Sequence, residues 1–240
     1  MNSIDLTYNE DLLQQRLIPC DSPERITITD DFFTSSAVLF SIIPHDNKPY
    51  ELILIHRTNR GTKHRGEMSF PGGKFEEIQD NSLKDTALRE TEEEIGVPRS
   101  KIKLIGCLDD FPTMTRYIVT PYVGVINKNQ ILVKQEREVQ EIVKIPIEFF
   151  VKKVNFKEQV VDLHGSKFPI FYFNYRQTGT KKVYTVWGAT AYMISNFIER
   201  VYDLEISELG MKRARVEKIN DIKEYIKLRN QVTKNFDKKI

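Results

Sequence analysis

Four glutamates crowd into the short run RETEEEIGV at residues 89–97. Glu90, Glu93 and Glu94 are three and four positions apart, so a helix would present their carboxylates on one face. Like charges at this spacing repel by roughly a few tenths of a kcal/mol per pair, and the C-terminal end of a helix disfavours anions further. A helix with only a structural role is not expected to carry this arrangement. Because carboxylate oxygens suit hard cations, the run predicts a site for Mg²⁺ or Mn²⁺.

Roles within this run follow from the same spacing. We expect Glu90, Glu93 and Glu94 to bind the metal, and Glu93 and Glu94 to take part in catalysis as well. Arg89 lies four residues before Glu93 and could hold a carboxylate in a fixed rotamer, so we group it with the catalytic residues. Glu92 points to another side of the helix and is expected to be solvated.

The segment before the helix is rich in donors for phosphate oxygens. Residues 57–67 are strongly basic, and the loop closes with the sequence FPGGK at 70–74. Arginine forks match the geometry of phosphate, whereas the alternative is a loop that is simply solvated. Its position beside the acidic helix makes phosphate binding as good an interpretation as solvation. The residues that we expect to contact substrate are Arg57, Arg60, Lys63, Arg65, Gly72, Gly73 and Lys74.

This order of a glycine loop and an acidic helix resembles the box of the Nudix hydrolases, G-x5-E-x7-R-E-U-x-E-E-x-G-U, where U is apolar. The second half matches residues 89–97, with Thr91 at an apolar position. The first half departs from the pattern, because fifteen residues lie between Gly73 and Arg89 where the box has thirteen. Asn81 stands where the box has its first acid. The acid that replaces it is expected to be one of Asp80, Glu76 and Glu77.

Longer stretches resemble the coenzyme A pyrophosphatases of that family, over roughly residues 35–200. They are LILIHRTNRGTKHRGEMSFPGGKFE at 52–76, GCLDDFPTMTRYIVTPYVG at 106–124, EREVQEIVKIPIEFF at 136–150, FPIFYF at 168–173 and VWGATAYMI at 186–194. The usual arginine of the first stretch falls on Thr62, so that match is inexact. The resemblance implies a hydrolase that cuts coenzyme A at its diphosphate, giving 3′,5′-ADP and 4′-phosphopantetheine. The general base is expected among the box glutamates first, with Glu138 and Glu141 as candidates outside the box.

Two alternatives stay open on the sequence alone. The first is a Nudix hydrolase for another nucleoside diphosphate derivative, such as ADP-ribose or a dinucleotide polyphosphate. The altered spacing upstream of the box keeps this alternative open. The second is a Nudix-fold sensor that binds a nucleotide without cleaving it. The intact set of Glu90, Glu93 and Glu94 argues against the sensor, because a binding module need not keep metal ligands.

Periodicity predicts the elements that position these residues. Apolar residues alternate or run together as strands at 37–43 and 50–56, which form a hairpin, and helical spacing covers 82–95 up to a stop at Gly96. The remaining elements expected are a helix at 9–17, strands at 102–108, 117–126, 140–145 and within 151–186, a helix at 187–203 and a helical tail from 206. The fold class is α/β, and the resemblance makes it a Nudix α/β/α sandwich with a mixed sheet. We divide the chain into a lead-in at 1–34, a Nudix domain at 35–203 and a basic helical C-terminal extension at 204–240.

Charge is distributed unevenly along this chain of 240 residues. The formal net charge is +2, yet residues 210–240 carry ten basic and four acidic side chains. Such a tail either serves an anionic partner or is a charged helix that packs on the domain or on a second subunit. We expect packing, through a stripe of Met211, Val216, Ile219, Ile222, Ile226 and Val232. Without basic–aromatic interleaving, nucleic acid is disfavoured as a partner, and a homodimer stays open.

Composition places the chain among globular proteins, with 40% hydrophobic and 29% charged residues. These values exclude a disordered or collagen-like chain. Cys20 and Cys107 lie far apart without a CxxC motif, so we interpret them as small apolar residues in a reducing compartment. No secretory signal and no uncharged apolar run of membrane length is visible. The expected location is therefore the cytoplasm, without a membrane partner.

Overall fold

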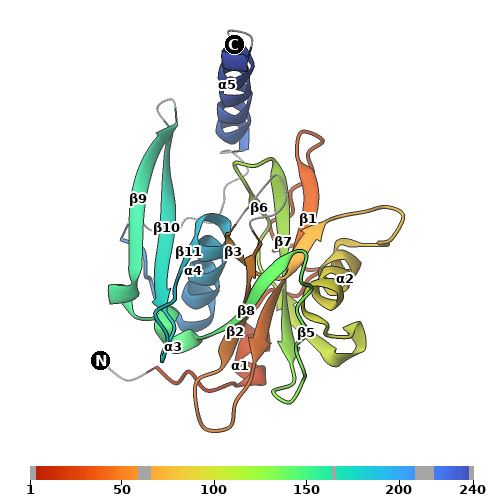
Figure 1. Ribbon diagram of the computed structural model, residues 1–240, viewed down its shortest axis with the longest axis vertical. Coiled ribbons are helices and arrows are strands. Elements are labelled where there is room, and N and C mark those ends of the chain that lie inside the picture. The colour runs from red at the N-terminus through yellow and green to blue at the C-terminus, as the bar shows by residue number, and fades with distance from the viewer. Residues whose placement is uncertain (1–3, 59–65, 164–165, 209–218, 238–240) are drawn as a thin grey trace.

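A mixed β-sheet with a helix on each face forms the centre of the molecule (Figure 1). The computed structural model describes residues 4–58, 66–163, 166–208 and 219–237. The sheet runs in the order β3-β2-β1-β7-β5, with β4 beside β1, β6 beside β7 and β8 beside β2. The strands of this sheet are β1 (Thr34–Ile43), β2 (Glu51–Arg57), β3 (Met68–Ser69), β4 (Gly72–Lys74), β5 (Ile102–Cys107), β6 (Phe111–Pro112), β7 (Tyr117–Ile126) and β8 (Val139–Pro146).

Strand β1 is the axis of this sheet. It pairs in parallel with β7 and antiparallel with β2 and β4, which makes the sheet mixed. Successive side chains of a strand point to opposite faces. On β1, Phe40 and Ile42 belong to the core under helix α4 (Gly188–Tyr202), whereas Leu39 and Ile43 belong to the core under helix α2 (Leu83–Ile95). The predicted α/β sandwich with a mixed sheet is confirmed, and so is the hairpin of β1 and β2.

A second, three-stranded antiparallel sheet covers the outer side of α4. It consists of β9 (Phe156–Leu163), β10 (Ser166–Arg176) and β11 (Val183–Trp187), in the order β11-β10-β9. Phe171 and Phe173 of β10 are buried in the core that includes α4. The short elements α3 (Ile147–Phe150), η1 (Arg99–Lys101) and η2 (Lys153–Asn155) connect the larger ones.

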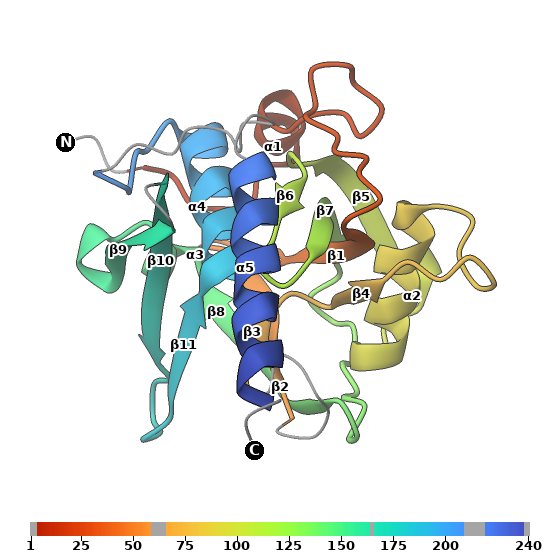
Figure 2. The same ribbon diagram turned by 90° about the horizontal axis from the view of Figure 1, so that it is seen from above.

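The C-terminal helix α5 (Ile219–Asp237) packs on the domain through the apolar side of its first half. Ile219, Ile222 and Ile226 are buried against a cluster that includes Phe33 and Ile118. This confirms packing for the part of the predicted stripe that is described. Met211 and Val216 lie outside the described residues, and the side chain of Val232 is not described either. Figure 2 shows α5 lying across the end of the main sheet, between α4 and strands β6 and β7.

The N-terminal segment is fastened to the domain, and this corrects the expectation for the two cysteines. Helix α1 (Glu10–Arg16) precedes a disulfide between Cys20 and Cys107. An isolated antiparallel β-bridge between Ile18 and Cys107 adds this segment to the end of β5. Sequence spacing could not reveal the bond, because the two residues meet only when the segment folds back onto β5. The bond also removes the support that unpaired cysteines gave to a reducing compartment.

Polar contacts follow the disulfide along the same segment. Arg25 Nη1 donates to Asp110 Oδ1 at 2.7 Å, and both side chains are buried. The backbone N–H of Ile28 donates to the other carboxylate oxygen of Asp110 at 2.9 Å. The described residues from 4 to 30 are therefore tied to the rest of the domain by the disulfide and by these hydrogen bonds. Within the described ranges, no helix is both long and apolar enough to cross a membrane.

Replacing Cys20 by serine is expected to lower the free energy of unfolding by about 2–4 kcal/mol, because a cross-link over a long loop restricts the unfolded chain. Cys20 is half-buried, so serine fits the site. Urea denaturation with and without reductant measures the effect. Reductant should destabilise the wild type and leave Cys20→Ser unchanged. Equal stability of the wild type with and without reductant would show that the two thiols are not bonded.

Candidate functional site

Helix α2 begins and ends where local capping dictates. The Ser82 hydroxyl accepts a hydrogen bond from the Asp85 N–H at 3.2 Å, which satisfies a free donor of the first turn. At the other end, Gly96 has φ 69°, and its N–H donates to the Glu92 carbonyl at 3.0 Å. Glycine adopts this left-handed conformation without steric cost. The helix therefore stops directly after the glutamate run and presents it at the helix end.

Strand β4 brings two glycines against this run. A Cβ atom on Gly72 would lie 2.4 Å from the Ala37 carbonyl oxygen of β1, and one on Gly73 would lie 2.3 Å from Glu90 Oε1. The clash at Gly72 is with backbone atoms, so that position requires glycine, whereas a side chain at position 73 would push the Glu90 carboxylate aside. The two glycines predicted as substrate contacts thus lie beside the acidic helix, and Lys74 follows them with an exposed side chain.

Arg89 organises the acidic side chains around it. Its guanidinium is buried and binds Asp80 with two hydrogen bonds, from Nε at 2.8 Å and from Nη2 at 2.9 Å. Its Nη1 donates to Glu90 Oε1 at 2.9 Å and to Glu93 Oε2 at 3.3 Å. The guanidinium beside it, together with neighbouring hydrogen bonds, lowers the pKa of Asp80 to about 2. Arg89 therefore holds three carboxylates at once, as the sequence predicted for one.

Of the three candidates for the missing acid, Asp80 is the one that bonds Arg89. Its carboxylate also accepts hydrogen bonds from the Glu76 N–H at 3.0 Å and the Thr86 hydroxyl at 2.9 Å. Glu76 and Glu77 have exposed side chains, and Glu76 accepts a hydrogen bond from Gln79 instead. The structure thus places Asp80, one position before Asn81, where a partner for Arg89 is needed.

Glu94 is the most buried member of the glutamate run. Its side chain is 3% exposed, and its two oxygens accept hydrogen bonds from Arg57 Nη1 at 3.0 Å and from the Gly72 N–H at 2.9 Å. Burial raises its pKa to about 8, even though Arg57 and the Gly72 N–H favour the charged form. Burial raises the pKa of Glu90 as well, against the opposing effect of Arg89. These carboxylates are costly to charge without a nearby cation.

Glu93 and Glu138 complete the acidic group from its open side. Each has a side chain that is 53% exposed. Glu138 raises the pKa of both Glu90 and Glu94, and its Oε2 lies 4.0 Å from Arg57 Nη2. Its position depends on the loop after β7, in which the Gln135 N–H donates to the Glu94 carbonyl at 3.0 Å. The candidate base outside the box therefore lies at the site because that loop returns to the end of α2.

Other predicted residues lie elsewhere or cannot be placed. Glu141 accepts hydrogen bonds from Lys182 at 2.7 and 2.9 Å and from the Tyr184 hydroxyl at 2.8 Å, on the side of β11. Arg57 contacts Glu94 rather than standing free for a phosphate. Arg60, Lys63 and Arg65 fall outside the described residues.

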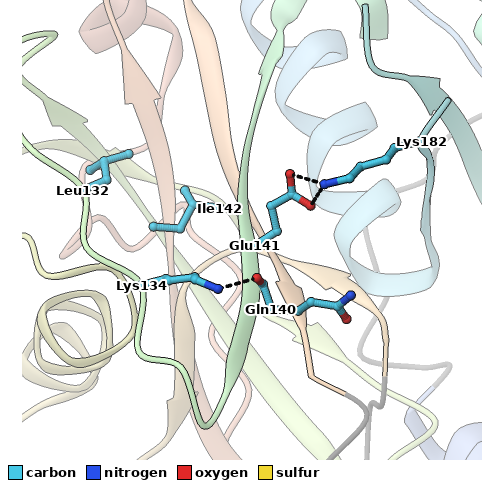
Figure 3. A pocket seen from close by; sticks show the side chains of 6 residues that line it. All are labelled: Leu132, Lys134, Gln140, Glu141, Ile142 and Lys182. Atoms are coloured by element: carbon cyan, nitrogen blue, oxygen red, sulfur yellow. Dashed lines mark hydrogen bonds and ion pairs between the residues drawn. The ribbon is translucent and has the colours of Figure 1, made fainter. Parts of the chain in front are cut away.

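Glu141 lines a cavity that is separate from the acidic group. The cavity has a volume of about 520 Å³, and Figure 3 shows Glu141 turned toward Lys182 and Lys134 turned toward the backbone of Gln140. Leu132 and Ile142 provide its apolar wall. The cavity surrounds the outer edge of β8 and is lined by none of the residues of the glutamate run.

The donor set at α2 fits a hard divalent cation. Its members are carboxylate oxygens, which Mg²⁺ and Mn²⁺ prefer, and two of them are buried with raised pKa values. Within the described part of the chain, no three acidic, histidine or cysteine side chains are already closed into a metal-binding group. Arg89 and Arg57 now hold the carboxylates that such an ion would compete for. The half-exposed Glu93 has the freedom to turn inward.

Comparison with known proteins gives consistent matches. A family model described as NUDIX domain matches residues 35–162, just over half of the chain. "Nudix hydrolase 15, mitochondrial" from Arabidopsis thaliana is 36% identical over 158 residues, which cover 65% of this chain and 54% of the relative. "Uncharacterized Nudix hydrolase NudL" from Photorhabdus laumondii is 31% identical over 166 residues, which cover 69% of this chain and 84% of the relative.

A second plant relative, "Nudix hydrolase 22, chloroplastic" from Arabidopsis thaliana, is 32% identical over 169 residues. The match covers 70% of this chain and 55% of the relative. The chain thus spans about half the length of the two plant relatives that it matches.

The raised pKa of Glu94 predicts a pH dependence of stability in metal-free protein. Between its ordinary value of 4.5 and its folded value of about 8, the folded state retains a proton that the unfolded state has lost. The protonated Glu94 therefore makes its full contribution to the free energy of unfolding below about pH 4.5, and this contribution is lost as the pH rises through about 8. The free energy of unfolding, measured with urea in EDTA, should fall by up to about 5 kcal/mol over this range, at about 1.4 kcal/mol per pKa unit.

Glu94→Gln is expected to flatten this profile, because the amide does not titrate. The matched control is Glu92→Gln on the same helix, since Glu92 is exposed and pairs with Arg99. The control should retain the slope of the wild type. The same slope in wild type and Glu94→Gln would contradict the assignment to Glu94.

Proposed function

The chain belongs to the Nudix family, and from this premise we propose that it is a metal-dependent pyrophosphohydrolase acting on coenzyme A or its derivatives. The observation that carries the proposal is the glutamate group at the end of α2, held by Arg89 and seated against Gly72 and Gly73. Buried carboxylates with raised pKa values contribute little to the stability of the fold, but their oxygens are suitable ligands for a cation. A diphosphate is anionic, so its hydrolysis requires such charge neutralisation.

Glu90, Glu93 and Glu94 are proposed to hold Mg²⁺ or Mn²⁺. When bound, the ion supplies neutralisation of the diphosphate and a more acidic water. The remaining roles fall to the chain itself. Glu93 and Glu138 are the half-exposed carboxylates of the group, so each can accept a proton from an attacking water. Arg89 orients Glu90 and Glu93 through its hydrogen bonds and thereby fixes where their oxygens point.

The phosphate oxygens are proposed to meet the glycine strand and the basic residues near it. Gly72 and Gly73 carry no side chains, so a diphosphate can approach the backbone closely. The exposed Lys74 lies next to them. Arg57 binds Glu94 in this structure, and its guanidinium, which is beside the glutamates, has the planar donor geometry that suits a phosphate oxygen. Arg60, Lys63 and Arg65 remain proposed as further phosphate contacts.

Coenzyme A is favoured among diphosphate substrates by the stretches that resemble its pyrophosphatases, at 52–76 and 106–124 above all. The second candidate, hydrolysis of ADP-ribose or a dinucleotide polyphosphate, is supported by the two extra residues between Gly73 and Arg89 and by Thr62 in place of the usual arginine. A sensor that binds without cleaving is disfavoured by the complete glutamate set.

A metabolite panel with Mg²⁺ or Mn²⁺ tests the function. The wild type should cut coenzyme A to 3′,5′-ADP and 4′-phosphopantetheine, read by mass spectrometry, faster than ADP-ribose or a dinucleotide polyphosphate. Glu93→Gln should lower turnover by about 10²–10⁴-fold, since a carboxylate that binds metal or accepts a proton is lost. Glu92→Gln should keep wild-type turnover, because that residue pairs with Arg99 away from the group.

Each alternative has its own outcome in the same panel. Preferred cleavage of ADP-ribose or a dinucleotide would keep the enzyme class and refute coenzyme A as substrate. Tight binding without turnover would indicate the sensor. Full activity of Glu93→Gln would refute the proposed metal site.

A further inference from the structure

Three cationic side chains gather around one aromatic ring at the end of the main sheet. The Arg116 guanidinium carbon lies 4.5 Å from the centre of the Phe32 ring, and the Lys223 and Lys227 ammonium nitrogens lie 5.9 and 5.8 Å from it. These are cation–π distances. Phe32 precedes β1, Arg116 precedes β7, and both lysines belong to α5, so tertiary packing builds this Phe32 cluster.

Arg116 occupies its place against a backbone preference. It has φ 68°, the left-handed region that non-glycine residues avoid at a cost of about 1–2 kcal/mol. Its Nε donates to the Phe32 carbonyl at 2.9 Å, which aims the guanidinium over the ring. Strain retained in this way indicates that the side chain has a use. Among the described residues, neither Nη atom of Arg116 donates a hydrogen bond to a protein acceptor.

The cluster carries more positive than negative charge. Lys223 pairs with Asp30. Arg116 and Lys227 have exposed side chains, and neither pairs with a carboxylate within the described ranges. Asp31 follows Asp30 in the chain and is exposed. It forms no ion pair with Arg116 or Lys227 among the described contacts. Arg116 and Lys227, held near one ring without an ion pair among the described residues, together offer several hydrogen-bond donors to an anion.

The Phe32 cluster lies on the same end of the sheet as the glycine strand. The Phe75 N–H, directly after β4, donates to the Ser35 carbonyl at 3.0 Å, and the Thr34 N–H donates to the Arg116 carbonyl at 2.9 Å. Ala37 of β1 pairs with Gly73, which lies against Glu90. Phe32 is five residues before Ala37 in the chain. At about 3.3 Å per residue this separation is at most about 17 Å. The ribose alone separates the 3′-phosphate of a nucleotide from its 5′-diphosphate, so a substrate that contacts both sites places them nearer together than this upper limit.

We propose that Arg116 and Lys227, backed by Phe32, bind a phosphate monoester on the nucleotide part of the substrate. The proposal rests on the proposed function and deepens it, because a second phosphate separates coenzyme A from ADP-ribose and from dephospho-coenzyme A. Lys227 belongs to α5, which lies beyond the segment matched by the family model. The C-terminal extension thus contributes to substrate choice as well as to packing.

The test compares two nucleotides in EDTA, so that binding is measured without turnover. Titration calorimetry of the full chain should show 3′,5′-ADP binding at least tenfold tighter than 5′-AMP. The double variant Arg116→Gly/Lys227→Ala should lose this factor and keep its affinity for 5′-AMP. Glycine accepts φ 68°, so the variant should melt at the wild-type temperature or above. Lys144→Ala, an exposed lysine on β8, is the control and should retain the factor.

Kinetics separate this proposal from the proposed function. The double variant should raise KM for coenzyme A about tenfold at unchanged kcat, with no change for dephospho-coenzyme A. Equal affinity of the wild type for both nucleotides would overturn the phosphate subsite, even if coenzyme A is hydrolysed. Inorganic phosphate that binds as tightly as 3′,5′-ADP would overturn it too, as a general anion patch. The tenfold preference with no hydrolysis of any substrate would support the subsite and refute the function.

Discussion

The contacts of Arg89 are the constraint on which the site depends. One buried guanidinium binds Asp80, Glu90 and Glu93 and also donates to the Lys74 carbonyl at 3.3 Å. It therefore joins the loop before α2, the acidic face of α2 and the glycine strand into one unit. A buried ion pair gains little over an apolar pair, but removing one partner costs about 3–5 kcal/mol. The main effect of the Arg89 ion pairs is therefore to fix the positions of the carboxylates, and their contribution to the stability of the fold is secondary.

Fixing those positions creates a second, opposite constraint. Burial disfavours the charged form of Glu94 even though Arg57 and the Gly72 N–H favour it, and Glu90 lies against Gly73. The molecule thus concentrates anionic groups at the end of a helix, where the helix dipole also opposes them. This cost is consistent with a site whose charge is completed by a cation and an anionic substrate. The cationic Phe32 cluster lies at the same end of the sheet. The anionic glutamates and these cations therefore occupy separate positions at one end of the molecule.

Sequence reasoning succeeded where structure is local. Helical spacing and the stop at Gly96 were sufficient to place the glutamates on α2, and alternation was sufficient for β1 and β2. It could not choose Asp80, because the loop from 75 to 82 has no periodicity to follow. It could not separate Glu138 from Glu141, since that depends on the loop bonding to the end of α2. The disulfide was missed because Cys20 and Cys107 meet only in the tertiary fold.

Binding of Mn²⁺ to the metal-free protein tests the central claim most directly, that buried glutamates of α2 form a cation site. Calorimetric titration at pH 7 in two buffers of different ionisation enthalpy measures both the affinity and the protons released. Glu94 has a pKa of about 8 without metal and must lose its proton to bind one. We expect saturable binding with release of about one proton. Absence of binding, or binding without proton release, would contradict it.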